Sequence, residues 1–469
     1  MAEPLWSAEE MVRATGGRLA GEAFAVSGVS IDTRTLTPGD LFVALVGERD
    51  GHEFAAQARA AGAVATLASR PVDGPYVLVD DTLKALEALA VAARDRAPGA
   101  LRAAVTGSVG KTSVTQAVAA GLALAGPSHH SVKSYNNHIG VPLTLARMPP
   151  AARRAVFEVG MNHAGEITPL SRMIRPHVAA VTTVGPVHTE AFADGEAGVA
   201  RAKAEVFDGL APGGLAVLNA DNRWFDFLKA EAERAGARTA VFGSQETCDA
   251  QLISFTPAED GARVEARLHG EALAFRLRQS GPHWGLNSLC VLLMLEALGV
   301  DLDTALAGLA AFAPLDGRGA ERRVAVAGGA FTLIDESYNA NPVSMSAALR
   351  SLGARPTKGR RIVALTDMLE LGPKSADFHA DIALAVEEAR VDLVFCAGPL
   401  MRSLWDALPP TRRGGYAETA EPLAPLVARA VEPGDLVMVK GSKGSKAAAV
   451  AAALAGMTID GPAAQGGAG

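Results

Sequence analysis

The sequence predicts an α/β protein of three domains. The chain has 469 residues and a mass of 48.2 kDa, which suggests three domains at roughly 150 residues each. Hydrophobic residues make up 49% and charged residues 20%, so the chain can build packed cores and has too little charge for a disordered protein. From about residue 84 onward, short apolar strands alternate with helical segments, which is typical of parallel sheets covered on both faces.

Residues 1–83 are predicted to form a small α/β N-terminal domain. Ser7 and Glu10 have the spacing of a capping box at the start of a short helix. A strand is expected at Leu41–Leu45, after a proline-glycine turn, and the alanine-rich stretch Phe54–Ala61 is expected to be helical.

Residues 84–314 are predicted to form the central, parallel-sheet domain. Its expected strands are Ala103–Thr106, Ala155–Val159, Val178–Val184 and Leu215–Leu218. Residues 247–279 differ, because apolar and charged residues alternate there, and this predicts an antiparallel insertion. The turn-rich segment Pro314–Gly319 is the expected linker to the next domain.

Residues 315–457 repeat the alternation and are predicted to form a Rossmann-like, doubly wound C-terminal domain. Its expected strands are Phe331–Asp335, Arg361–Thr366, Leu393–Cys396 and Leu436–Val439. Residues 458–469 are rich in glycine and alanine and are expected to be a flexible tail.

Composition excludes several classes of protein. A net charge of −7 and a pI near 5.9 argue against a nucleic-acid binder, which usually carries a basic stripe. Cys248, Cys290 and Cys396 are far apart, which indicates a reducing compartment and no cysteine-zinc site. No secretory signal is visible, and no apolar run reaches the ~18 residues of a membrane helix. We therefore expect a cytoplasmic protein that is not inserted in a membrane.

The strongest chemical signal is a glycine-rich loop between the strand Ala103–Thr106 and a helix. The loop comprises Gly107, Ser108, Val109, Gly110, Lys111, Thr112 and Ser113. Backbone N–H groups of such loops converge on phosphate oxygens, Lys111 can reach the β- and γ-phosphates, and the Thr112 hydroxyl can bind Mg²⁺. The loop is shorter than the usual G-x-x-x-x-G-K-[ST], since Val105 stands where the first glycine would fall. The alternative is a glycine-rich helix start with an incidental lysine.

Three further candidates follow strands of the same predicted sheet, where ligands bind in folds of this class. Glu158 ends an apolar strand, His188 follows the strand Val178–Val184, and Lys203 lies on the apolar side of a helix expected over 196–210. Each has an ordinary alternative: a structural acid, a surface histidine, and a lysine that reaches solvent or pairs with an acid. A buried Lys203 would be the better amine nucleophile, for example toward CO₂, because burial disfavours its charged form.

Two polar segments outside the phosphate loop also indicate nucleotide binding. Gly281–Asn287 opens a helix, and Asp335–Pro342 directly follows a strand. A polar cluster in that place is expected to face a ligand. Alternatively, Asn341 or Ser344 caps the helix that follows, a role that is compatible with binding.

In combination, these motifs resemble those of the ATP-dependent Mur ligases of peptidoglycan precursor synthesis. The resemblance extends to about residue 455 and rests on the phosphate loop, Glu158, His188, Lys203, the H-x-x-x-N element of His283 and Asn287, Gly317-Arg318 and Asp335. Segments 32–45, 135–142, 158–167 and 336–342 are similar to those of the family members that add D-alanyl-D-alanine.

The resemblance implies a role for each domain. The N-terminal domain would hold the UDP end of UDP-N-acetylmuramoyl-tripeptide through Thr33 and Arg34, and Asn136 and Asn137 would also bind this substrate. The central, ATPase-like domain would bind the phosphates of ATP. The implied Mg²⁺ ligands are Thr112, Glu158, His188 and a carbamylated Lys203, and the implied catalytic residues are Lys111, Glu158, His188 and Lys203.

The same resemblance assigns nucleotide contacts to the C-terminal side of the protein. His283 and Asn287 match the element near the adenine, and Arg318, Asp335 and Asn339 match nucleotide contacts. The C-terminal domain would also help to bind the incoming D-Ala-D-Ala.

The implied reaction activates the terminal carboxylate of the tripeptide as an acyl phosphate, which the amine of D-Ala-D-Ala then attacks. It would serve cell-wall synthesis and so cell shape and division, and we expect a monomer. The third residue of the tripeptide, lysine or diaminopimelate, stays open. The alternatives are another Mur or folylpolyglutamate-type ligase, a regulatory P-loop ATP-binding module, or a phosphotransfer kinase.

Overall fold

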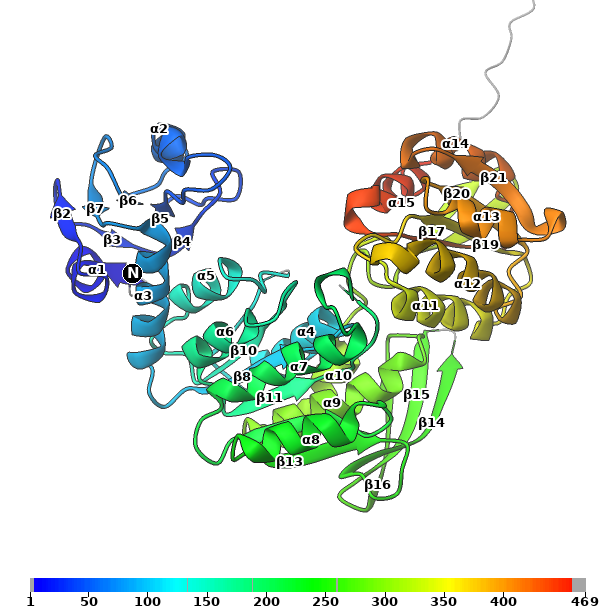
Figure 1. Cartoon of the computed structure of the whole chain (residues 1–469), viewed down its shortest axis with the longest axis horizontal. Helices are drawn as coiled ribbons and strands as arrows, with labels where there is room; N and C mark the ends of the chain where they lie inside the picture. The colour runs from blue at the N-terminus through cyan, green and yellow to red at the C-terminus, as the bar shows by residue number, and fades with distance from the viewer. Residues whose placement is uncertain (1–3, 133, 188, 259, 458–469) are drawn as a thin grey trace, which may run out of the picture.

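The computed structural model describes residues 4–132, 134–187, 189–258 and 260–457. Within these residues, the strands form three large sheets, each built from a separate stretch of the chain, and one short ribbon whose strands are interleaved with those of the N-terminal sheet. Figure 1 shows the N-terminal and C-terminal units at opposite ends of the central one. The predicted α/β class and three-part architecture are confirmed, whereas the domain boundaries given above stay a prediction.

The N-terminal unit combines short strands with three helices in the described residues. Its elements are β1 (Trp6–Ser7), α1 (Ala8–Thr15), β2 (Arg18–Ala20), β3 (Ala25–Val26), β4 (Gly28–Ser30), β5 (Asp40–Val43), η1 (Gly51–Phe54), α2 (Ala55–Ala60), β6 (Ala65–Ala68), β7 (Tyr76–Leu78) and α3 (Thr82–Asp95). The sheet has the order β2-β7-β6-β5-β4, and β1 pairs with β3. The predicted capping box is present, because Ser7 accepts a hydrogen bond from the Glu10 amide and Glu10 accepts one from the Ser7 amide.

The central unit contains the sheet that carries the phosphate loop. Its strands are β8 (Leu101–Thr106), β9 (Ser128–His130), β10 (Arg154–Glu158), β11 (Val178–Val181), β12 (Leu215–Asn219), β13 (Arg238–Gly243), β14 (Ala250–Ala258), β15 (Gly261–Leu268) and β16 (Glu271–Leu277). Their order is β16-β15-β14-β13-β12-β11-β8-β10-β9. The strands from β9 to β14 run parallel, while β15 and β16 are antiparallel, as the alternation in 247–279 predicts.

Helices cover both faces of this sheet. The helical elements are α4 (Lys111–Leu124), α5 (Gly140–Ala146), α6 (Ile167–Ile174), η2 (Thr189–Ala191), α7 (Glu196–Ala204), η3 (Glu205–Gly209), α8 (Phe225–Arg234), α9 (His283–Ala297) and α10 (Leu302–Ala311). Residues of α4, α9 and α10 form the apolar core on one face, and residues of α5, α6, α7 and α8 form the core on the other.

The C-terminal unit is a doubly wound sheet with an antiparallel edge. Its elements are β17 (Ala320–Val326), β18 (Gly329–Glu336), α11 (Pro342–Ala354), β19 (Arg361–Thr366), η4 (Gly372–Lys374), α12 (Ser375–Glu388), β20 (Leu393–Ala397), α13 (Arg402–Ala407), η5 (Pro410–Arg412), β21 (Arg413–Ala417), α14 (Ala420–Ala430), β22 (Leu436–Lys440), η6 (Lys443–Ser445) and α15 (Ala447–Ala455). The order is β17-β18-β22-β19-β20-β21, with α11, α12 and α13 on one face and α14 and α15 on the other.

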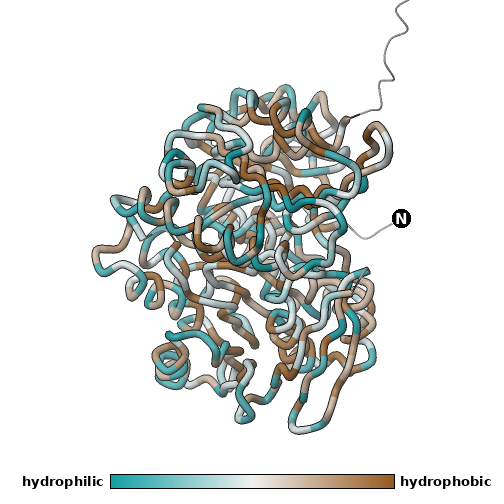
Figure 2. Tube along the Cα trace, turned by 90° about the vertical axis from the view of Figure 1, so that its right-hand side faces the viewer, coloured by the Kyte–Doolittle hydropathy of each residue, from teal (hydrophilic) through white to brown (hydrophobic). Residues whose placement is uncertain are grey.

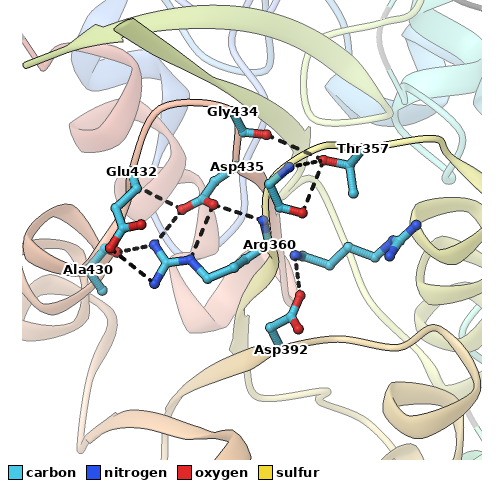
Figure 3. A network of polar contacts seen from close by, with 9 residues as sticks. Thr357, Arg360, Asp392, Ala430, Glu432, Gly434 and Asp435 are labelled. Carbon is cyan, nitrogen blue, oxygen red and sulfur yellow. Dashed lines mark hydrogen bonds and ion pairs between the residues drawn. The ribbon is translucent and has the colours of Figure 1, made fainter. Parts of the chain in front are cut away.

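A charged network ties together the amino ends of β19 and β22 (Figure 3). The Arg360 guanidinium donates to both carboxylate oxygens of the buried Asp435, at 3.2 and 2.7 Å, and to the Ala430 carbonyl oxygen at 2.7 Å. Burial raises the pKa of Asp435, but the hydrogen bonds from Arg360 and from the Glu432 amide together outweigh burial, and the net pKa is lowered. Because this network lies at the amino ends, the carboxyl ends of the same strands are left for binding a ligand.

Two predicted elements end early. The strand expected over Val178–Val184 stops at Val181, because the chain then bends toward the phosphate loop, where the Thr183 carbonyl accepts the Ser108 amide at 2.8 Å. The helix expected over 196–210 is α-helical to Ala204 and continues as the 3₁₀ segment η3.

In the central and C-terminal units, the strands β9, β13, β17 and β21 were not predicted. Each is short or half exposed, and β17 in particular presents charged side chains on the edge of its sheet, so hydrophobic runs do not reveal it.

Hydrophobic stretches occur in all parts of the molecule, interleaved with hydrophilic ones (Figure 2). Among the helices of the described residues, none has the combination of length and apolar character that crossing a bilayer requires.

Candidate active site

A large cleft lies between the central and C-terminal units. Its volume is about 940 Å³, at the upper end of the ~300–1,000 Å³ typical of ligand sites. One wall comes from the phosphate loop and the carboxyl ends of the central strands, and the other comes from the linker and the carboxyl ends of β18 and β22. Predicted site residues that line it are Ser108, Val109, Gly110, Lys111, Thr112, Ser113, Asn136, Asn137, Glu158, His283, Asn287, Arg318 and Asn339.

The phosphate loop turns sharply between β8 and α4. Gly107 and Gly110 have φ values of 149° and 90°, and a Cβ on Gly107 would lie 2.0 Å from the Thr182 hydroxyl oxygen, so a side chain cannot be accommodated there. No described side chain caps α4, and the first-turn residues Lys111, Thr112 and Ser113 line the cleft. The free amides and the helix dipole therefore present positive potential to an anion in the cleft.

Lys111 folds back over its own loop. Its ammonium group donates to the Gly107 carbonyl oxygen at 2.7 Å. Burial lowers the pKa of Lys111, and the nearby Arg318 lowers it further, while Glu158 partly offsets both. The hydrogen-bond acceptor of this ammonium group is an uncharged carbonyl, so an incoming phosphate would give it an anionic partner.

A directed chain of hydrogen bonds crosses the cleft floor. The Thr112 hydroxyl donates to Glu158 at 2.7 Å, and the Asn136 amide donates to the other Glu158 oxygen at 2.7 Å. Because Thr112 donates to Glu158, the Ser134 hydroxyl, 3.1 Å away, donates to Thr112, and it accepts from the Arg318 guanidinium at 3.3 Å. The buried Glu158 is thus a hydrogen-bonded acid that also faces the cleft.

Lys203 lies behind this floor, not on the wall of the cleft. Its side chain is 2% exposed, and no described residue pairs with its ammonium group by a hydrogen bond or an ion pair. Burial lowers its pKa well below the ordinary value, and the charge of Lys111 lowers it further. The alternatives of a solvent-reaching or acid-paired lysine therefore do not describe this residue.

His188 lies outside the described residues. Its neighbour Val187 lines the cleft.

The predicted nucleotide contacts come from both units, and all but Asp335 line the cleft. Arg318 stacks over the Tyr338 ring, with 4.0 Å between the guanidinium carbon and the ring centroid. Asn287 lies against the phosphate loop, since a Cβ on Gly110 would be 3.5 Å from its amide nitrogen. Asp335 does not line the cleft: it accepts hydrogen bonds from the Gly317 amide at 3.2 Å and from the Ser337 amide at 3.0 Å.

Ser134 and Lys440 are among the cleft residues that were not predicted, whereas Glu336 and Tyr338 come from the polar segment Asp335–Pro342, which was expected to face a ligand. Lys440 is buried, donates to the Asn339 carbonyl oxygen at 3.0 Å and pairs with Glu336 at 3.4 Å. Its position at the end of the predicted strand Leu436–Val439 is a signal that could have identified it. Asn341 caps α11 together with Ser344, as the capping alternative predicts.

Thr33 and Arg34 lie on the N-terminal unit and do not line the cleft. Arg34 is exposed and pairs with Asp32 at 2.6 Å. Its pKa is raised chiefly by that hydrogen bond, and in smaller part by Tyr135, which precedes Asn136 in the chain.

Comparison with known proteins agrees with this geometry. Family models match residues 25–96 (Mur ligase family, catalytic domain), 105–295 (Mur ligase middle domain) and 322–443 (Mur ligase, glutamate ligase domain). A curated relative from Escherichia coli (strain K12) is 38% identical over 391 residues, covering 81% of this chain and 83% of the relative. It is named UDP-N-acetylmuramoyl-tripeptide--D-alanyl-D-alanine ligase.

The chain belongs to the Mur ligase family.

Two solved Mur ligases have the same architecture as this one. MurF from Acinetobacter baumannii superposes with a TM-score of 0.84 at 27% identity, covering 97% of this chain and 99% of that one. The MurF ligase from Thermotoga maritima, solved in complex with ADP, has a TM-score of 0.76 at 24% identity, covering 91% and 97%. The predicted family and the prediction of an enzyme, a ligase, are confirmed.

Proposed function

We propose that this Mur ligase uses ATP to join D-alanyl-D-alanine to UDP-N-acetylmuramoyl-tripeptide, through an acyl-phosphate intermediate, in peptidoglycan synthesis. The observation that carries the proposal is the cleft in which a phosphate loop, Glu158 and the Arg318 wall converge, in a chain whose curated relatives bear the name of this ligase. A carboxylate is a poor acyl donor, and phosphorylation by ATP makes it reactive.

The phosphate loop positions the triphosphate. The first-turn amides of α4 and the Lys111 ammonium group hold the β- and γ-phosphates, and Arg318 approaches from the opposite wall. Negative charge grows on the phosphoryl oxygens during transfer, so cations fixed in advance lower the barrier. His283, Asn287 and Asn339 contribute to the nucleotide end of the same cleft.

The donor set fits Mg²⁺. Thr112 and Glu158 present hard oxygen atoms next to the phosphate loop, the ligand type that Mg²⁺ prefers, and His188 belongs to the proposed set. When bound, Mg²⁺ neutralises charge on the phosphoryl oxygens.

Lys203 is proposed to be carbamylated. Burial lowers the pKa of its amine and so favours the neutral form, which can attack the carbon of CO₂, forming a C–N bond and releasing a proton. The product is an anionic group behind the cleft floor, where the uncharged amine would otherwise lie close to Lys111. We expect Lys203→Ala to cripple turnover, bicarbonate not to restore it, and small carboxylic acids to restore part of it. Full activity of this variant would eliminate the carbamate.

The decisive experiment measures ADP release with each substrate omitted in turn. Release and stoichiometric amide formation are expected only with ATP, UDP-N-acetylmuramoyl-tripeptide and D-Ala-D-Ala together. Product with single amino acids would instead indicate another Mur or folylpolyglutamate-type ligase. ATP hydrolysis without amide would indicate a regulatory module, and a stable phosphorylated product without an amine would indicate a kinase.

A cytoplasmic location and a monomeric state belong to the same proposal. The support for the location is that Cys248, Cys290 and Cys396, all in the described part of the chain, are free and buried, as in a reducing compartment.

A further inference from the structure

Three backbone amides at the start of α6 converge on one carboxylate, that of Glu205. One oxygen accepts the Gly165 amide at 2.6 Å, and the other accepts the amides of Ile167 at 3.0 Å and Thr168 at 3.2 Å. Glu166, the residue at the N-cap position of α6, forms no side-chain cap bond within the described residues. The cap of this helix therefore comes from η3, about 40 residues further along the chain.

A carboxylate suits this place for two reasons. The first amides of a helix have no partner inside the helix, and the helix dipole makes their end positive. Both oxygens of Glu205 are occupied by N–H donors, so an amide side chain, which has a single acceptor, cannot replace it fully.

Close packing supports the same junction. The Ser171 hydroxyl of α6 donates to the Val206 carbonyl oxygen, and the Thr168 hydroxyl donates to Asp208 at 2.6 Å. A Cβ on Gly209 would lie 2.2 Å from the Ser171 backbone, so η3 and α6 touch backbone to backbone. The two elements are therefore closely packed and joined by hydrogen bonds.

The segment held by Glu205 forms part of the cleft. It is the loop Gly160–Glu166, of which Gly160, Met161, Asn162 and Glu166 line the cleft. The loop is anchored at its start, where the Gly160 amide donates to the Asn136 carbonyl oxygen at 2.8 Å, and near its end, where Gly165 donates to Glu205. Glu166 accepts the Asn162 amide at 2.7 Å and closes the loop on itself.

We propose that Glu205 is a positioning residue that fixes the loop Gly160–Glu166 for the peptide part of UDP-N-acetylmuramoyl-tripeptide. The loop lies beside Asn136, and helix α5, which begins at Gly140, packs against the N-terminal unit that would hold the UDP end of this substrate. Glu205 also follows Lys203 by two residues, so the clamp joins this loop to the helix that carries the proposed carbamate. The inference rests on the proposed function.

The test is Glu205→Gln, which keeps the size of the side chain but loses one acceptor. We expect the KM for UDP-N-acetylmuramoyl-tripeptide to rise about tenfold, as when a supporting contact is loosened, while the KM for ATP stays within about twofold. Amide hydrogen exchange at residues 165–168 should accelerate. Glu205→Asp, which keeps the charge, should give a smaller rise in the KM for the tripeptide substrate.

The matched control is Asp208→Asn, since asparagine still accepts the Thr168 hydroxyl. It should leave both KM values unchanged. An unchanged KM for the tripeptide substrate in Glu205→Gln, an equal rise in the KM for ATP, or the same rise in the control would overturn the proposal. Amide formation by the wild-type enzyme in the same assay reports on the proposed function separately, because its absence would refute that function whatever the exchange data show.

Discussion

The two junctions between the units of this protein are built in opposite ways. Where the N-terminal unit meets the central one, Trp6 is 2% exposed, donates to the Ala146 carbonyl oxygen at 2.8 Å and lies under the Arg96 guanidinium, 3.6 Å from its ring centroid. Leu143 and Ala146 of α5 belong to the apolar core of the N-terminal unit. Arg147 adds a hydrogen bond to the Val29 carbonyl oxygen at 2.6 Å.

The junction between the central and C-terminal units is hollow and polar. It encloses the cleft of about 940 Å³, and the hydrogen bond from Arg318 to Ser134 crosses it at 3.3 Å. Apolar burial resists separation, whereas a polar cleft gains its contacts when a ligand fills it. The first junction therefore contributes mainly to stability, whereas the second contains the candidate active site.

The largest effect is expected from Lys111→Ala on the cleft wall. Turnover should fall by about 10³-fold or more, because a fixed cation at the transferred phosphate is lost. The free energy of unfolding should change by less than about 1 kcal/mol, since no apolar packing is removed. Steady-state kinetics and urea denaturation measure the two quantities, and retention of near wild-type turnover would break the assignment of chemistry to this wall.

Trp6→Ala should have the converse profile. Loss of a buried tryptophan at the first junction should lower the free energy of unfolding by about 3–5 kcal/mol. At a temperature where the variant is folded, its KM for ATP should match that of the wild type. A stability loss below about 1 kcal/mol would contradict a tightly packed junction.

His129 should make stability near the first junction depend on pH. Burial lowers its pKa to about 4, although its hydrogen bond to the Thr144 carbonyl oxygen acts in the opposite direction. Between pH 6.5, the ordinary pKa of histidine, and about 4, the unfolded chain binds a proton that the folded chain does not, so stability is lost as pH falls through this window. The contribution is on the order of 2 kcal/mol.

His129→Gln should abolish that part of the pH dependence, because glutamine keeps a donor for Thr144 without titrating. Urea denaturation of both proteins at pH 7 and at about pH 5 gives the difference. Parallel stability profiles for the two proteins would refute the assignment.

The smallest effect is expected from Arg318→Lys. Lysine keeps the charge but loses the planar stack on Tyr338 and the fork that reaches Ser134, so kcat/KM for ATP should fall about tenfold. Thermal unfolding should be unchanged, because the cleft contributes little to stability. If Arg318→Lys instead lowered the unfolding temperature and left the kinetics unchanged, the junction between the central and C-terminal units would also contribute to stability.

Local patterns were predicted well because their physics is local. The capping box at Ser7 and the phosphate loop around Lys111 depend on neighbours within a few residues, and both appear where the sequence places them. Helical periodicity placed Lys203 on the apolar side of its helix but left open whether its side chain reaches solvent, and the structure buries it.

Other features could not be predicted, because they join segments that are distant in the chain. Ser134 matters through Thr112 and Arg318, and Glu205 through amides about 40 residues away. Asp335 was expected to face the nucleotide, whereas in the fold it holds the turns at Gly317 and Ser337. The site assignments themselves, His188 included, stay predictions.

The sequence by itself determined the α/β class, the order of the units, the phosphate loop and the family, because periodicity, turn residues and short motifs are written along the chain. Only the tertiary structure decided which junction is packed with apolar side chains and which one encloses a cleft. It also decided which hydroxyl groups link the two walls of the cleft and which carboxylate caps α6. Those outcomes depend on distances between segments far apart in sequence, and such distances exist only once the apolar faces have packed.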